Sequence, residues 1–495
     1  MKTNLLICLF VLACFGFGHA QDDQKLRVAG VFTDHMVFQR NMPLRMYGTA
    51  ASDEHITVHF SGHEQKTIVT PEGKWEVVFM PMQHGGPYEI SVETSQEKIV
   101  IKDILVGDVW ICAGQSNMDF QLKNAETGSR ELAGKISNPN IRFLKMNTLA
   151  ETGNFPWDTV TLEKTNQLQF FSGSWQRCDR QNAGSFSAVG YYFGKTIAAS
   201  EHVPIGLIQV SVGGSPTESW IDKQSLQQDS LLVPMLDNWQ SSDMVMPWCR
   251  ERAAMNVKNA KSAGQRHPYE PGYNFQAGIS RFVRFPVKGV IWYQGESNAH
   301  NISLHVHLFE KLVKSWREKW GYKFPFYYVQ LSGIDRPSWP DFRDSQRKML
   351  ARIPNSGMAV SYDLGDSLNV HPLKKQEIGE RLARLALYNT YKKKVVPNGP
   401  VLRSVQKKGN KILIDFSSAG HLSTKAHAPL TGFELITDDG KRLTANAIIL
   451  NNRVHITIPA GEKIKSVCYA YQPFTRANLI NDAGLPASTF IVPIP

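Results

Sequence analysis

Cysteine is scarce in this chain, with 6 among 495 residues, and no two of them form a CxxC pair. A cysteine-ligated zinc site is therefore unsupported, and we expect neither a metal nor another cofactor. Four cysteines lie beyond the first twenty residues, and their three possible pairings stay open: Cys112, Cys178, Cys249 and Cys468. Cys112 lies inside an apolar stretch, where a buried free thiol is expected.

Long apolar runs are lacking after the first twenty residues. Within those twenty, Lys2 gives a positive start, Leu5 to Phe17 is mostly apolar, and Gly18-His19-Ala20 supplies small residues at the end. This pattern predicts a signal peptide at 1–20, and its apolar run is too short for a stable membrane span. Lipid attachment at Cys14 is the alternative. We therefore expect an exported protein, periplasmic or secreted, with no membrane span and with its oligomeric state open.

Charge of one sign does not gather into a stripe, although the formal net charge is +11 and the pI is about 9.2. The dense basic run is Lys392-Lys393-Lys394, which is typical of a solvated helix end. A nucleic-acid partner is therefore not expected. The apolar fraction of 42% and the charged fraction of 20% are those of a folded soluble protein.

Both ends of the mature chain contain short segments in which apolar and polar residues alternate. In the first part, strands are predicted at 56–60, 74–79 and 88–92, with turn residues between them. After the linker Pro397-Asn398-Gly399-Pro400, alternation of the same kind returns. These patterns predict an N-terminal β domain at 24–102 and a C-terminal β domain at 397–495, both resembling β-sandwiches.

The central region, 103–396, alternates apolar strand-like segments with helical patterns, which predicts an α/β domain with a parallel sheet. Leucines and tryptophans recur every four residues from Leu304 to Trp320, and a second helix is expected to begin at Pro372. Five strand segments each end in a small or polar cluster: 109–113, 205–212, 287–293, 326–331 and 358–362. Because the carboxyl ends of parallel strands share one sheet edge, these clusters should meet there.

Three of those clusters and a later histidine supply the parts of an ester-hydrolysing site. Ser116, in Gly-Gln-Ser-Asn, is a candidate nucleophile, and His371, shortly after the last strand, is a candidate base. The oxyanion donors would be the backbone N–H of Ser116, that of Gly213 or Gly214, and the side-chain amide of Asn298. The long segment 240–275 is a candidate wall of the substrate cleft.

Several other side chains have two interpretations. Arg343 and Arg347 either contact an acidic substrate or pair with nearby carboxylates such as Asp344. Histidines 300, 305 and 307 superficially resemble a metal cluster, but a solvated helix is the better interpretation. Four large aromatics either stack on sugar rings or, as we favour, belong to the core: Trp220, Trp292, Tyr293 and Trp339.

The motifs taken together resemble the SGNH-type hydrolases, and in particular the sialate O-acetylesterase group of carbohydrate acetylesterases. The resemblance rests on Gly-Gln-Ser-Asn-Met, the glycine pair, Trp-Tyr-Gln-Gly-Glu-Ser-Asn and the late His-Pro. It extends to segments 36–40, 85–88, 107–110, 363–366 and 484–488. It implies a flavodoxin-like SGNH hydrolase core, no metal, and hydrolysis of acetyl esters on sugars. It also implies Ser116 as nucleophile, His371 as base, and Gly214 (or Gly213) with Asn298 in the oxyanion hole.

The sequence departs from the commonest SGNH pattern at the residue that orients the histidine. Three positions before His371 stands Leu368, whereas Asp366 lies five before it. Asp366 is either the third triad member or a loop-holding residue, and a Ser–His dyad held by a backbone carbonyl is the alternative. Gln115 and Gln294 are expected to brace the site. Glu296 either tunes the site or, as we slightly favour, has a structural role such as capping the next helix.

We therefore predict a serine ester hydrolase that deacetylates O-acetylated sialic acids through an acetyl-enzyme. An esterase for acetylated xylan or another polysaccharide is the first alternative, and a glycan-binding protein without catalysis is the second.

Overall fold

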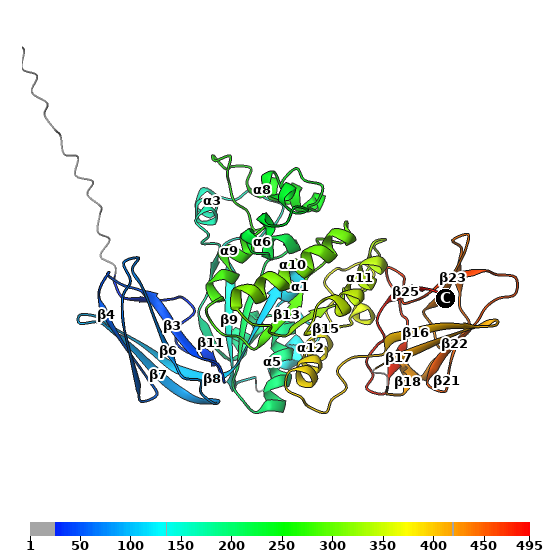
Figure 1. Ribbon diagram of the computed structural model, residues 1–495, viewed down its shortest axis with the longest axis horizontal. Coiled ribbons are helices and arrows are strands. Elements are labelled where there is room, and N and C mark those ends of the chain that lie inside the picture. Colours follow the sequence, from blue (N-terminus) through cyan, green and yellow to red (C-terminus); the bar gives the residue numbers. More distant parts are fainter. Residues whose placement is uncertain (1–24, 135, 418–419) are drawn as a thin grey trace, which may run out of the picture.

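The computed structural model of the chain describes residues 25–134, 136–417 and 420–495. The predicted signal peptide and the alternative at Cys14 lie outside the described residues. A β-rich region, an α/β region and a second β-rich region follow one another along the long axis (Figure 1). Among the helices that the structure describes, none is long and apolar enough to cross a membrane.

The N-terminal region consists of strands alone, as the sequence predicts. They are β1 (Arg27–Val28), β2 (Val37–Gln39), β3 (Leu44–Thr49), β4 (His55–Phe60), β5 (His63–Ile68), β6 (Lys74–Phe79) and β7 (Gly85–Glu93). Strands β1, β3 and β6 form one sheet, and β4 pairs with β5 and β7 in another. The alternating burial along β4 and β6 turns their apolar side chains to one interior.

The 17-residue strand β8 (Lys98–Gly114) joins this region to the α/β region. Its first part pairs antiparallel with β7, and its later residues pair in parallel with two strands of the central sheet. The domain boundary predicted between 102 and 103 therefore falls inside a continuous strand. Asp103 lies at this joint with a positive φ of 55°, and its carboxylate pairs with His35, Arg142 and Arg177.

The central sheet is parallel, and its strands are ordered β9-β12-β8-β13-β14-β15. Besides β8 it contains β9 (Asn138–Thr148), β12 (Ile205–Ser211), β13 (Gly289–Tyr293), β14 (Phe326–Val329) and β15 (Ser356–Ala359). Two short strands, β10 (Phe171–Ser172) and β11 (Trp175–Cys178), pair antiparallel with β9. All five strand segments expected from the sequence are present; four have bounds within a few residues, whereas the one expected at 109–113 is the end of the much longer β8.

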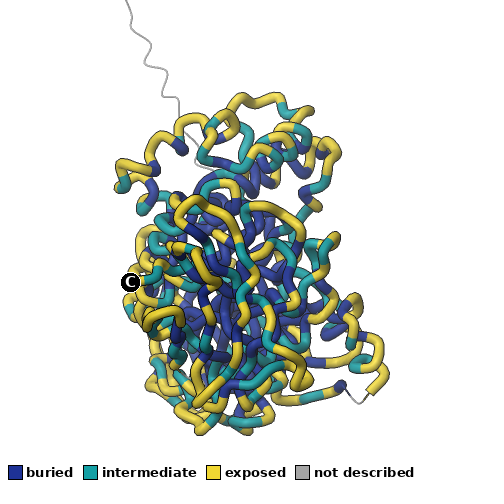
Figure 2. The backbone as a smooth tube through the Cα atoms, turned by 90° about the vertical axis from the view of Figure 1, so that its right-hand side faces the viewer, coloured by how far each residue is buried: buried dark blue, intermediate teal, exposed yellow. Residues whose placement is uncertain are grey.

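Helices cover both faces of this sheet, as expected when both faces are apolar. The helices of the α/β region are α1 (Ser116–Asp119), α2 (Gly128–Ala133), α3 (Thr159–Asn166), α4 (Arg180–Ser185), α5 (Ala188–Glu201), α6 (Lys223–Gln227), α7 (Val233–Asp237), α8 (Pro247–Asn256), α9 (Tyr273–Ala277), α10 (Ile302–Trp320), α11 (Trp339–Arg352) and α12 (Gln376–Asn389). Short 3-10 helices span Leu122–Asn124, Thr217–Trp220, Ile279–Phe282, Tyr362–Leu364 and Lys425–His427. Alternate residues of β8 enter different cores: Trp110 and Cys112 pack with α5 and α12, whereas Ile111 belongs to the core that contains α10. Figure 2 shows the buried segments gathered in the interior.

The C-terminal region is again built of strands. They are β16 (Val401–Lys408), β17 (Lys411–Ser417), β18 (Leu422–Thr424), β19 (Phe433–Thr437), β20 (Arg442–Thr444), β21 (Ala447–Leu450), β22 (Arg453–Thr457), β23 (Ile464–Tyr469), β24 (Leu479–Asn481) and β25 (Phe490–Pro493). They form two four-stranded sheets and one two-stranded sheet. The region is fastened to α11 by buried Arg343, which donates hydrogen bonds to the carbonyls of Ala470, Gln472 and Pro473.

The structure corrects some local expectations and confirms others. The last helix of the α/β region begins at Gln376 rather than at Pro372, so a loop carries His371 to Lys375. The helix over 304–320 is confirmed and ends at Gly321. The four large aromatics are core residues, at most 2% exposed, so they do not stack on sugars. All four described cysteines are free and buried, including Cys112.

Candidate active site

Ser116 lies directly after β8, at the first residue of α1. The chain turns there at Gly114, which has a φ of +142°, and a Cβ at this position would lie 2.2 Å from the Tyr293 carbonyl oxygen. Only glycine allows this approach of β8 to β13. The next amide, Gln115 N, donates to the same Tyr293 oxygen at 3.1 Å. The turn therefore directs Ser116 outward from the carboxyl edge of the sheet.

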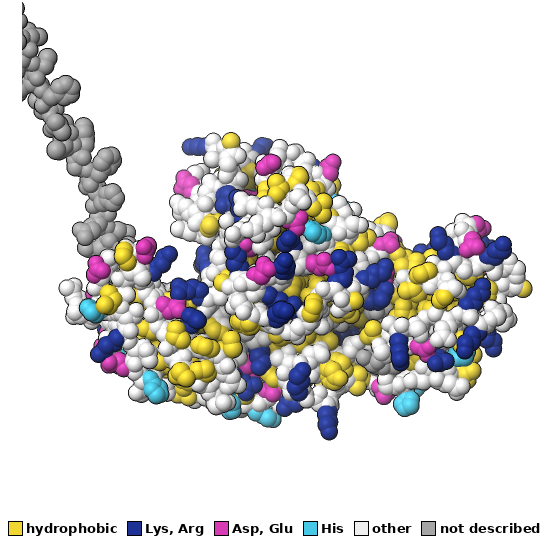
Figure 3. All heavy atoms as spheres, viewed as in Figure 1, with side chains coloured by type: hydrophobic (Ala, Val, Ile, Leu, Met, Phe, Trp, Pro, Cys, Tyr) yellow, Lys and Arg dark blue, Asp and Glu magenta, His cyan; other side chains and the backbone are white. Residues whose placement is uncertain are grey.

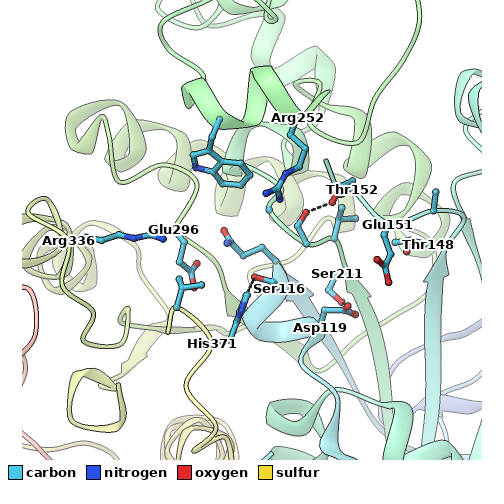
Figure 4. A pocket seen from close by; sticks show the side chains of 18 residues that line it. Ser116, Asp119, Thr148, Glu151, Thr152, Ser211, Arg252, Glu296, Arg336 and His371 are labelled. Atoms are coloured by element: carbon cyan, nitrogen blue, oxygen red, sulfur yellow. Dashed lines mark hydrogen bonds between the residues drawn. The ribbon is translucent and has the colours of Figure 1, made fainter. Parts of the chain in front are cut away.

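His371 comes from the loop between the Tyr362–Leu364 helix and α12, and its Nε2 lies 2.7 Å from Ser116 Oγ (Figure 4). The structure thus brings together the two residues predicted as nucleophile and base. Burial lowers the pKa of His371 below its ordinary value, and the positive charges of Lys375 and Arg336 lower it further. The neutral imidazole, the form that accepts a proton, is favoured.

Three backbone N–H groups at the cleft have no hydrogen-bond acceptor among the described residues: those of Ser116, Gly213 and Gly214. The Ser116 N–H is free because the first residues of a helix have no intrahelical acceptor. The glycine carbonyls are fixed from behind, since Gly213 O accepts from Thr152 Oγ1 and Tyr269 OH, both at 2.7 Å. N–H groups that are held in place and have no other acceptor can stabilise a developing oxyanion.

Around Ser116 and His371 lies a cleft of about 640 Å³. Its walls come from the residues at and after the ends of β8, β9, β12, β13 and β14, together with α8 and the His371 loop. Trp248 and Arg252 belong to segment 240–275, so this segment does form part of the cleft wall, although it contains α8. Arg252 stacks on the Trp248 ring at 4.7 Å. The carboxylates of Asp119 and Glu151 and the guanidinium of Arg336 also line the cleft.

Asn298 is not placed as an oxyanion donor, which corrects the sequence-based expectation. It is 2% exposed and does not line the cleft. Its Nδ2 donates to Glu218 Oε2 at 2.8 Å, and its Oδ1 accepts from Thr217 N and Gln294 Nε2. Burial raises the pKa of Glu218 to about 7. Asn298 and Gln294 therefore brace the segment behind the Gly213–Gly214 turn, and bracing is the role predicted for Gln294.

Gln115 and Glu296 both line the cleft. Gln115 Oε1 accepts from Gly295 N at 3.4 Å, a bracing contact as predicted. Glu296 does not cap the following helix, because the side chain of Asn301 accepts from Leu304 N at that end. Instead, Glu296 Oε1 accepts from Asn117 Nδ2, so Glu296 is joined to the residue after Ser116.

Asp366 does not reach His371. Its Oδ1 accepts from Leu368 N at 2.8 Å and from Asn369 N at 3.0 Å, and these donors lower the pKa of its carboxyl group. No hydrogen bond or ion pair in the described structure joins Asp366 to His371. Of the two interpretations of Asp366, the structure therefore supports the loop-holding one.

We expect Asp366→Asn to keep kcat/KM for p-nitrophenyl acetate within about tenfold of the wild-type value, a change below about 1.4 kcal/mol. The asparagine Oδ1 can still accept the two backbone hydrogen bonds. Steady-state kinetics of the folded variant check this expectation. A larger loss would indicate that the Asp366 carboxylate takes part in proton transfer at His371.

The remaining predicted polar residues lie outside the cleft. Arg347 pairs with Asp344, as the default interpretation has it, and Arg343 fastens the C-terminal region. The solvated-helix interpretation is wrong for His305, which is 2% exposed and stacks near Phe342 at 4.5 Å. His307 pairs with Asp229. No group of three or more potential metal ligands is found within the described ranges.

Sequence reasoning missed Lys375 and Asn117. Lys375 is fully buried, although it stands beside exposed Lys374 and is typical, in sequence, of a solvated helix start. Asn117 directly follows the nucleophile, and its side chain contacts both Glu296 and Lys375. The one signal in the sequence was that Asn117 directly follows the candidate nucleophile and that Lys375 lies four residues after the candidate base.

Comparisons with known proteins show which family this chain resembles. The family model "Carbohydrate esterase, sialic acid-specific acetylesterase" matches residues 106–244 and 260–388. The sialate O-acetylesterase of Rattus norvegicus is 28% identical over 436 residues, covering 77% of this chain and 76% of the relative. That of Homo sapiens is 29% identical over 378 residues, covering 69% and 66%. A crystal structure of a carbohydrate acetylesterase from Xanthomonas citri matches with a TM-score of 0.79 and 29% identity, covering 94% of this chain and 99% of that one.

The α/β fold, the Ser116–His371 contact and these relatives define the class of protein, an ester hydrolase that acts on acetylated carbohydrates. Within that class, the chain belongs to the sialic acid-specific acetylesterase family of carbohydrate esterases.

Proposed function

We propose that this protein removes O-acetyl groups from sialic acids through an acetyl-enzyme on Ser116. The 2.7 Å contact between Ser116 Oγ and His371 Nε2 in an open cleft carries the proposal. Apart from β9, which lies beyond β12, the order across the sheet is β12-β8-β13-β14-β15, and these five strands numbered along the chain give 2-1-3-4-5, the flavodoxin-like order. This order supports an SGNH-type core with its site at the strand ends.

In the proposed reaction, His371 Nε2 takes the Ser116 proton while Oγ attacks the acetyl carbonyl carbon. The N–H groups of Ser116, Gly213 and Gly214 would stabilise the resulting oxyanion. Collapse breaks the bond to the sugar oxygen, which receives the proton from the imidazolium. Water then attacks the acetyl-enzyme, with His371 again as base, and releases acetate and free Ser116.

Two arginines of the cleft, which share it with the carboxylates of Asp119 and Glu151, support an acidic sugar over a neutral one such as acetylxylan. Arg252 and Arg336 both line the cleft, and neither forms an ion pair with a carboxylate of the described chain. A guanidinium that is not already paired can bind a carboxylate in bidentate fashion. Over the face shown in Figure 3, by contrast, basic and acidic side chains are interspersed.

Acetate release from a panel of substrates tests the proposed function. The panel contains O-acetylated sialic acids with the ester at different positions, acetylated neutral monosaccharides and acetylxylan. The proposal expects the highest kcat/KM on a sialic acid ester. A higher value on acetylxylan would overturn the substrate assignment and favour the polysaccharide esterase.

Arg252→Gln is expected to raise KM for an O-acetylated sialic acid about tenfold, as the loss of one charge-assisted hydrogen bond implies. KM for an acetylated neutral sugar should change much less, because that substrate offers no carboxylate. Lys258→Gln, a change of charge on an exposed residue just beyond α8, serves as the control. An equal rise in KM for both substrates would show that Arg252 does not bind the carboxylate of the acidic sugar.

A further inference from the structure

Beneath the proposed nucleophile lie two buried ionisable groups, Lys375 and Glu296, that the reaction above does not use. Burial lowers the pKa of Lys375 to about 7 and raises the pKa of Glu296. The Lys375 ammonium donates to Asn117 Oδ1 and lies over two aromatic rings, 4.7 Å from the centre of Phe120 and 5.5 Å from that of Tyr293. Glu296 Oε1 accepts from Asn117 Nδ2. Because burying charge costs free energy that a merely structural pair need not incur, this arrangement calls for a role.

Lys375 and Glu296 form no direct ion pair with each other, and the Asn117 side chain lies between them. An ammonium only donates hydrogen bonds, and a carboxylate only accepts them. Together they fix which end of the amide is oxygen and which is nitrogen. With either charge removed, the amide loses one of the two contacts that orient it.

The orientation of this amide affects the position of the proposed base. Asn117 Nδ2 also donates to Val370 O at 3.0 Å, and Val370 directly precedes His371. One side chain, attached next to Ser116, therefore holds the residue next to His371. If the amide were reversed, its oxygen would face both the Val370 carbonyl and the Glu296 carboxylate, which repel it.

The rest of the His371 loop lacks such a link to the nucleophile. Asp366 and Asn369 bond within the loop itself, and Leu373 O accepts from Glu126 N. A triad carboxylate would ordinarily hold the histidine, but no carboxylate in the described residues bonds to His371. Among the described contacts of this loop, the Asn117–Val370 hydrogen bond is the one that ties the residue beside His371 to the residue beside Ser116.

We propose that Lys375 and Glu296 are positioning residues, which set the separation of Ser116 and His371 through Asn117. This inference rests on the proposed roles of Ser116 and His371. Lys375 does not line the cleft, so it acts on the geometry of the catalytic pair and not on substrate binding. A displacement of about 1 Å in such a pair is enough to lower the rate about 100-fold.

Lys375→Met tests the proposal, because methionine fills a similar space beside Phe120 and Tyr293 without a charge. We expect kcat for p-nitrophenyl acetate to fall about 100-fold, with KM within about threefold of wild type. The rate of Ser116 labelling by a fluorophosphonate should fall in parallel. Lys374→Met makes the same change at an exposed neighbour and should leave both rates unchanged.

Glu296→Gln distinguishes an amide-orienting pair from two independent contributions. Glutamine Oε1 can still accept from Asn117 Nδ2, and it leaves no unpaired buried charge when Lys375 is absent. The double variant Lys375→Met/Glu296→Gln should therefore have a kcat at or above that of Lys375→Met alone. Independent effects would multiply and make the double variant slower.

A role in stability alone predicts a lower melting temperature with kcat of the folded fraction unchanged, and this result would overturn the proposal. If Lys375→Met does not fold, Asn117→Ala decides in its place, with the same expected loss of kcat. Ser116→Ala, run in parallel, separates the two assignments. Activity in that variant would refute the proposed nucleophile, whereas inactive Ser116→Ala beside fully active Lys375→Met would refute only the positioning role.

Discussion

Replacing Ser116 by alanine is expected to lower kcat/KM for p-nitrophenyl acetate at least about 10⁴-fold, the scale seen when a triad nucleophile is removed. The variant retains the cleft, the imidazole and the N–H groups of Gly213 and Gly214, but it has no oxygen to form the acetyl-enzyme. Residual hydrolysis would come from water, positioned by the remaining groups. The fold should be unchanged, because the Ser116 side chain lines the cleft and its Oγ bonds only to His371 among the described residues.

Three measurements test this prediction. Steady-state kinetics give the loss, thermal unfolding shows that the variant is folded, and mass spectrometry of quenched wild-type enzyme should find one acetyl group on the peptide that contains Ser116. Ser367→Ala is the matched control, since the Ser367 hydroxyl forms no hydrogen bond in the described structure. Activity above a tenth of wild type in folded Ser116→Ala would mean that another group attacks the ester.

The position of Ser116 was predictable because it depends on local rules. An apolar segment followed by glycine and a polar cluster predicts a strand end, and parallel strands deliver such ends to one edge. The same reasoning placed His371 and the glycine pair 213–214 correctly. These features need only the order of elements along the chain.

The sequence did not reveal which hydrogen-bond partners the polar side chains have. Asn298 and Asp366 are both close in sequence to the right strand ends, yet one donates to Glu218 and the other accepts backbone amides of its own loop. Such choices depend on distances set by packing between elements far apart in the chain. Lys375 shows the same limit, because it packs against Phe120 and Tyr293, which come from distant parts of the chain.

Replacing His371 by alanine is expected to lower kcat/KM about 10³- to 10⁵-fold, nearly as much as the loss of Ser116, since the two act as a unit. Without the imidazole, the Ser116 hydroxyl keeps its proton at neutral pH and attacks slowly. Fluorophosphonate labelling of Ser116 should slow by a similar factor. Loss of acetate release with normal labelling would mean that His371 acts only in deacylation.

The pH dependence of the wild-type enzyme follows from the environment of His371. Because burial and the charges of Lys375 and Arg336 lower its pKa, the neutral base should persist below the ordinary value near 6.5. The acid limb of kcat/KM against pH is therefore expected below 6.5, with activity rising as pH increases through it. Arg336→Gln removes a positive charge that disfavours the imidazolium, so the limb should move to higher pH.

The same profile tests how His371 is held. A carboxylate bonded to the imidazole would stabilise the imidazolium and move the acid limb to higher pH. Replacing that carboxylate would move the limb to lower pH. Since Asp366 accepts only backbone amides of its loop, Asp366→Asn should leave the limb in place while Arg336→Gln shifts it upward. A downward shift in Asp366→Asn would show that Asp366 reaches His371 in the working enzyme. An unshifted limb in both variants, together with an inactive His371→Ala, would mean that the limb reports a group other than His371.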